Sequence, residues 1–70
     1  MKVKIGDKVC YHLWGDTGNR TATIQGIEIC KEGLKNGRPV SKCDISKHHG
    51  VVDLSDGHWC YFYQVKEVQS

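Results

Sequence analysis

Apolar and polar residues alternate along the chain in short segments with a period of two. In residues 8–14, for example, Val9, Tyr11 and Leu13 occupy every second position, as in a strand with one buried face. Clusters of Gly, Asn and Asp separate such segments, and no segment has the spacing of an amphipathic helix. The pattern predicts an all-β fold with five strands, at roughly residues 8–14, 20–31, 42–54 (interrupted), 58–62 and 66–68.

The second segment changes its parity half-way. Ala22 and Ile24 share one face, whereas Ile27 and Ile29 continue the apolar pattern on the opposite parity, with Gly26 at the change. An extra residue in one strand of a pair has this effect, so a β-bulge is predicted at Gly26. A long strand that bends at a bulge suits a sheet that curls into a small barrel.

The hairpin that follows is less well defined. A type I′ turn at residues 36–37 would pair Cys30 with Cys43. The same register sets Lys31 directly against Lys42, and like charges in that position are unfavourable. The sequence therefore leaves the register of residues 24–47 open.

The last hairpin gives a clearer pattern. A turn at residues 56–57 pairs Leu54 with Trp59 and Val52 with Tyr61, so that one face is uniformly large and apolar. That face is predicted to be core. The opposite face then carries Asp53, His58 and Cys60.

Length and charge restrict the class of protein. Seventy residues are expected to form a single domain, residues 1–70, with a thin core and little room for a deep active site. The formal net charge is +2, with +3 in residues 31–50 and −2 in residues 51–70, which is not the balance of a dedicated nucleic-acid coat. Without a signal-peptide pattern or an apolar run long enough for a bilayer, the expected location is the cytoplasm, with no membrane partner and with reduced cysteines.

The layout of the chain resembles the SH3-like barrel, including its KOW-type and Tudor-type modules. The resemblance lies in the opening Ile-Gly-Asp-Lys-Val, the hairpin Leu-Ser-Asp-Gly-His-Trp and the closing Tyr-Gln-Val-Lys-Glu-Val, and it extends to small barrel proteins of bacterial and mobile-element genomes. It implies a five-stranded SH3-like barrel that binds a protein, a peptide or a nucleic acid. In such barrels, aromatic residues of the first loop and of the end of the fourth strand line the ligand groove. By that likeness Trp14, Phe62 and Tyr63 would form the groove here.

The middle of the chain offers a second candidate surface. Lys35 and Arg38 flank the turn at residues 36–37 and would project together, as suits contacts to phosphate groups. The alternative is a solvated hairpin whose charges keep an edge strand from pairing with other chains.

Zinc binding is the alternative function that the cysteines suggest. Cys43, His58 and Cys60 are the candidate ligands, with the Asp53 carboxylate opposite Cys60 and with His48 or His49 as further candidates, because thiolate, imidazole and carboxylate are ligands of zinc. The alternative for these residues is an ordinary strand with a half-buried thiol and an exposed imidazole.

A thiol-dependent enzyme is a more distant alternative. Cys60 or Cys43 as a nucleophile would need a base in contact, an orienting group and an oxyanion site, which a barrel of this size rarely provides. We therefore expect a non-enzymatic binding module whose contact residues are Trp14, Phe62, Tyr63, Lys35 and Arg38, with no cofactor.

Overall fold

The computed structural model describes residues 1–12, 18–31 and 37–69. The strands found within these ranges, together with one short 3-10 helix, are β1 (Lys2–Lys4), β2 (Lys8–Tyr11), β3 (Arg20–Ile29), β4 (Arg38–Val40), β5 (Lys42–Asp44), β6 (Gly50–Leu54), β7 (Trp59–Tyr61), η1 (Phe62–Gln64) and β8 (Val65–Val68). The predicted all-β class is confirmed. The predicted number of strands is too low, because β1 and β4 have only three residues each and are too short to show an alternation.

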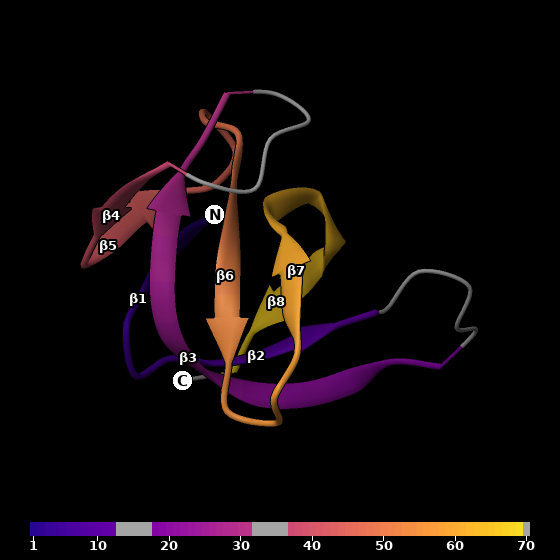
Figure 1. The fold of residues 1–70 in the computed structure, drawn as a ribbon. Coiled ribbons are helices and arrows are strands. Elements are labelled where there is room, and N and C mark those ends of the chain that lie inside the picture. Colours follow the sequence, from indigo (N-terminus) through magenta and orange to yellow (C-terminus); the bar gives the residue numbers. More distant parts are fainter. Residues whose placement is uncertain (13–17, 32–36, 70) are drawn as a thin grey trace.

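The strands pair only in antiparallel fashion within the described ranges. The main sheet has the order β7-β6-β3-β2-β8 with β4 added to β3, and β1 and β5 form a separate two-stranded sheet (Figure 1). Because β7 and β8 lie at opposite ends of that order, the pairing of the described strands leaves the sheet open and does not close a barrel. No helix in these ranges is long and apolar enough to cross a bilayer.

Strand β3 joins the two halves of the main sheet by bending at a bulge. Its first half pairs with β2, with Lys8 opposite Thr23 and Tyr11 opposite Arg20. Its second half pairs with β4 and β6. The register with β6 shifts between Ile24 and Gly26, so the predicted bulge is confirmed. Figure 1 shows β3 running along the bottom of the view and then turning upward.

One apolar cluster fills the space inside this bend. It contains Tyr11, as the alternation in the first segment predicts, and residues from almost every strand: Val3, Val9, Tyr11, Ala22, Ile24, Ile27, Ile45, Val52, Leu54, Cys60, Phe62 and Val65.

The last hairpin differs by one residue from the predicted register. Asp53 lies opposite Trp59, Val52 opposite Cys60, and Val51 opposite Tyr61. A shift of one residue moves every side chain of a strand to the other face. Cys60 is therefore buried in the core, whereas Trp59 and Tyr61, which were predicted to be core, lie on the outer face.

The loop between β6 and β7 explains this shift. Leu54 N–H donates to His58 O at 2.9 Å and Gly57 N–H donates to Leu54 O at 3.2 Å, so the loop has three residues, 55–57, and not two. Gly57 has a φ of 86°, the left-handed conformation that closes three-residue hairpin loops. The Asp-Gly pair occurs in both kinds of loop, and the extra residue inverts the faces of β7.

This loop is fastened to β2 and β3. Tyr11 donates its hydroxyl hydrogen to Asp56 Oδ2, Asp56 Oδ1 accepts from His58 N–H at 3.1 Å, and Ser55 Oγ accepts from Thr23 N–H at 3.0 Å. Burial, together with the contact to Asp56, raises the pKa of Tyr11. Burial opposes ionisation of Asp56, but the hydrogen bonds from Tyr11 and His58 outweigh it and lower the pKa of this carboxyl.

The middle of the chain does not form the predicted hairpin. β4 pairs with β3 with Ile29 opposite Arg38 and Ile27 opposite Val40, whereas β5 pairs with β1. Cys43 therefore lies opposite Val3 and not opposite Cys30. The observed pairing also removes the contact between Lys31 and Lys42 that made the predicted register unfavourable.

We expect Gly50→Ala to destabilise the fold by at least about 2 kcal/mol, the usual cost of overfilling a packed site. A Cβ at Gly50 would lie 2.1 Å from the Glu28 carbonyl oxygen and 2.5 Å from Phe62 Cζ. Urea denaturation measures the change. The matched control is Gly26→Ala, whose Cβ would come closer than 3.4 Å only to Asp53 Oδ2, at 3.1 Å. Equal losses for the two variants would contradict this assignment.

Asp56→Asn is expected to lower the free energy of unfolding at neutral pH by about 1–2 kcal/mol, because it removes a charged acceptor from the buried Tyr11. The folded-state pKa of Asp56 lies below its unfolded value. Its contribution is therefore complete above the unfolded pKa and is lost as the pH falls through the folded pKa. Thermal unfolding between pH 7 and the acid range should show a steeper acid loss for the parent chain than for the variant.

Tyr11→Phe tests the same contact from the other side. The double variant should lose little more than either single variant, since the two residues share one hydrogen bond. Asp53→Asn is the control, because Asp53 is exposed on the outer face of β6. Additive losses for Tyr11→Phe and Asp56→Asn would show that the hydrogen bond contributes nothing.

Candidate functional site

Three aromatic rings follow one another along the outer face of the last hairpin. The ring centroids of Trp59 and Tyr61 are 5.2 Å apart with the planes at 81°, and those of Tyr61 and Tyr63 are 5.3 Å apart with the planes at 8°. We call Trp59, Tyr61 and Tyr63 the aromatic ladder. Both arrangements, edge-to-face and stacked, are favourable for aromatic pairs.

The register of β7 creates this ladder. Trp59 and Tyr61 are two residues apart on one strand, so they project to the same side, and Cys60 between them points into the core. The ladder lies at the end of the main sheet, because β7 pairs with β6 alone among the described strands.

Gln64 anchors η1, the 3-10 helix that carries the last ring of the ladder. Its Oε1 accepts from Tyr61 N–H at 2.9 Å, and its Nε2 donates to His12 O at 2.8 Å. His12 N–H in turn donates to Gln64 O at 3.2 Å. Gln64 is 3% exposed. These hydrogen bonds tie η1 both to the end of β7 and to the residue that follows β2.

The rings differ in exposure. Tyr63 is 66% exposed, whereas Trp59 and Tyr61 are half-buried. Partial desolvation and the neighbouring Tyr61 raise the pKa of Tyr63. A tyrosine hydroxyl is neutral near pH 7 and can donate a hydrogen bond. The ladder therefore offers a surface of aromatic rings with at least one hydroxyl group, that of Tyr63.

Two carboxylates share the outer face with these rings. Asp53 lies directly opposite Trp59. Glu28 lies opposite Val51, and Val51 in turn lies opposite Tyr61. Residues directly opposite one another in an antiparallel pair project to the same face. The face is therefore both aromatic and acidic.

The predicted binding residues have different outcomes. Tyr63 is exposed, as expected of a groove residue, and Arg38 is exposed on β4. Phe62 is only 4% exposed and belongs to the core, where its ring lies over Gly50, so its assignment to the groove is wrong. Trp14 and Lys35 lie outside the described residues.

Sequence reasoning missed Trp59 and Tyr61 as surface residues. The signal was present, because Trp59, Tyr61 and Tyr63 alternate with period two across the end of the hairpin. It was assigned to the wrong face because the opposite parity, with Cys60 and Phe62, is also apolar.

The candidate metal ligands are not brought together as predicted. Cys60 is fully buried in the core, Cys43 is partly buried on β5, and His58 is exposed just before β7. Burial raises the pKa of Cys60 to about 12, and burial also raises that of Cys43. Throughout the described ranges, no three His, Cys, Asp or Glu side chains form a group that could hold a metal ion.

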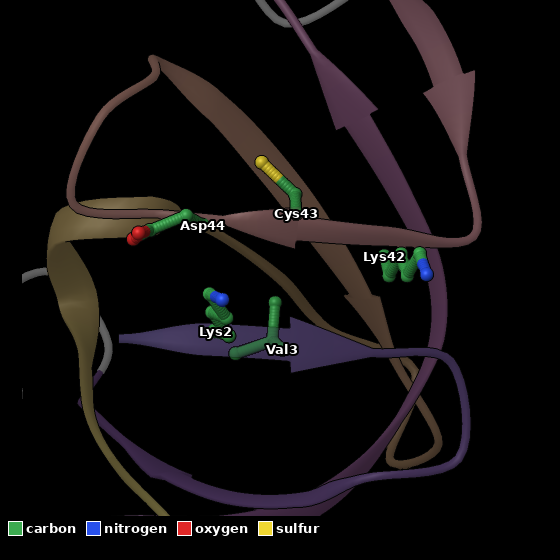
Figure 2. A pocket seen from close by; sticks show the side chains of 5 residues that line it. All are labelled: Lys2, Val3, Lys42, Cys43 and Asp44. Carbon is green, nitrogen blue, oxygen red and sulfur yellow. The ribbon is translucent and has the colours of Figure 1, made fainter.

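A second feature lies on the separate two-stranded sheet. A pocket of about 270 Å³ is lined by residues of both strands, Lys2, Val3, Lys42, Cys43 and Asp44 (Figure 2).

Comparisons of the chain with protein-family models, with curated proteins and with solved structures found no match.

Gln64→Ala is expected to destabilise the fold by about 2 kcal/mol, because it leaves the Tyr61 N–H and the His12 carbonyl without their partner. It should also free η1, so the near-UV circular dichroism of the stacked Tyr61 and Tyr63 should weaken in the folded state. Gln25→Ala is the control, since Gln25 is exposed at the bulge of β3. An unchanged aromatic signal in folded Gln64→Ala would contradict the positioning role.

Proposed function

We propose that this chain is a non-enzymatic binding module that holds an extended peptide segment against the aromatic ladder. The observation that carries the proposal is the exposure of Tyr63 while its ring is stacked on Tyr61, which in turn meets Trp59 edge-to-face. Rings that are already ordered give a large contact area at a small cost in conformational entropy. A ligand that lies across them needs no rearrangement of the sheet.

The charges of the face select the ligand. Asp53 and Glu28 favour a partner with basic side chains, and an arginine above a tyrosine or tryptophan ring adds a cation–π contact. Proline-rich segments suit such a face, because their extended conformation is preformed and their rings pack on aromatic side chains. Phosphate groups of a nucleic acid would meet the two carboxylates, so this face favours a peptide.

The likeness to SH3-like barrels supports the same function. Such barrels bind ligands through aromatic residues near the end of the fourth strand, and the aromatic ladder extends from β7 into η1. We also assign the module to the cytoplasm, since its four cysteines are free thiols, as in proteins of reducing compartments.

Tyr63→Ala should weaken binding of a short proline-rich peptide that carries arginines by about tenfold or more, which is typical of an aromatic anchor at an interface. Fluorescence anisotropy of the labelled peptide measures the affinity. Asp53→Asn should weaken binding of this peptide but leave unchanged the affinity of a peptide with glutamine in place of each arginine.

The control variant is Ile5→Ala, which removes another exposed apolar side chain that lies outside the main sheet. Its affinity for the peptide should equal that of the parent chain. If Ile5→Ala weakens binding as much as Tyr63→Ala, or if neither peptide binds the parent chain, the proposal is wrong.

A further inference from the structure

The two-stranded sheet of β1 and β5 carries positive charge on its exposed side. Lys2 lies opposite Asp44, and Lys4 lies directly opposite Lys42. Val3 and Cys43 alternate with these residues, and Val3 packs in the core. We call the exposed side of this sheet, with Lys2, Lys4 and Lys42, the basic ribbon.

The nearby carboxylates do not balance these lysines. Asp7 accepts from Lys4 Nζ at 2.7 Å, so Lys4 is paired. Asp44 accepts from the amino terminus at 3.3 Å, and no ion pair of Lys2 or Lys42 is found in the described part of the chain. The ribbon therefore keeps two uncompensated cations.

The surroundings of Asp44 show the same excess. The Ser46 N–H donates to Asp44 Oδ1 at 3.1 Å and lowers the pKa of this carboxyl, and the amino terminus and Lys47 lower it further. The Asp44 carboxylate thus interacts with the amino terminus and with Lys47, although Lys2 lies opposite it in the ribbon. An additional anion would be attracted to this end of the molecule.

The pocket supplies the place for that anion. Its lining includes the two lysines without an ion pair, Lys2 and Lys42, and also Asp44, whose carboxylate already accepts from the amino terminus and from Ser46 N–H (Figure 2). Its volume of about 270 Å³ is many times the ~30 Å³ that one water molecule occupies in the liquid. A phosphate group has room to enter it.

The spacing of the two lysines favours a repeating anion. Lys2 and Lys42 lie on neighbouring strands and are offset by two positions along the ribbon, so their backbone positions are roughly 8 Å apart. A phosphodiester backbone presents charges one after another at short intervals, so adjacent phosphates can meet both lysines at once.

We propose that the basic ribbon binds the phosphate backbone of a single-stranded nucleic acid, with Lys2 and Lys42 as the contact residues. The pocket between β1 and β5 receives one phosphate group, and binding is independent of base sequence. This site lies on a different sheet from the aromatic ladder and does not depend on the peptide proposal.

The double variant Lys2→Gln, Lys42→Gln tests the proposal. Binding of labelled oligo(dT) is followed by fluorescence anisotropy from about 50 to about 200 mM salt. Removal of two phosphate contacts should weaken binding by roughly tenfold for each lysine at the lower salt concentration, and should reduce the slope of log K against log salt by about 1.4. Affinity for the proline-rich peptide should be unchanged.

The matched control is Lys8→Gln, Lys66→Gln, which removes the same charge from exposed positions on β2 and β8. This control variant should keep most of the parent chain's affinity for the oligonucleotide. If the two double variants lose affinity equally, attraction by net charge alone explains the binding and the proposed site is wrong. The proposal is also wrong if the parent chain does not bind oligo(dT) at the lower salt concentration.

Discussion

The three-residue loop between β6 and β7 determines which side of the last hairpin faces the core. Gly57 adopts the left-handed conformation that this loop requires, and Asp56 fixes the loop through its hydrogen bond with the buried Tyr11. A loop shorter by one residue would turn Cys60 outward and Trp59 and Tyr61 inward. The aromatic ladder therefore depends on a contact between β2 and a turn distant from it in sequence.

Gln64 extends this constraint from the hairpin to the end of the sheet. The strand pairing leaves β7 and β8 at opposite ends, yet η1 must connect them through three residues. The Gln64 side chain and backbone bridge Tyr61 and His12, replacing the hydrogen bonds that a closed ladder would have supplied there. The same bridge anchors η1, which carries Tyr63 beside Tyr61, so the stability of the fold and the geometry of the aromatic ladder depend on one buried amide.

Local features of the fold could be predicted from the sequence, and non-local ones could not. The bulge at Gly26 and the long β3 follow from a change of parity within one segment. The face of β7 could not be chosen, because Trp59 and Tyr61 on one side and Cys60 and Phe62 on the other are both apolar, and the Asp-Gly turn fits two loop lengths. The pairing of β1 with β5 joins Val3 to Cys43, forty positions away, and three-residue strands carry too little pattern to reveal it.

That non-local pairing also decides where the charge lies. The net charge of +2 suggests a nearly neutral surface. The basic segment, residues 31–50, is far from Lys2 and Lys4 in the sequence. Because β1 pairs with β5, the N-terminal lysines join Lys42, while Asp53 and Glu28 remain with the aromatic rings on the main sheet. Two surfaces of opposite character thus arise from a balanced composition. The two proposed ligands, a basic peptide and a phosphate backbone, have opposite charges and would be attracted to different sheets, which is the electrostatic requirement for binding both at the same time.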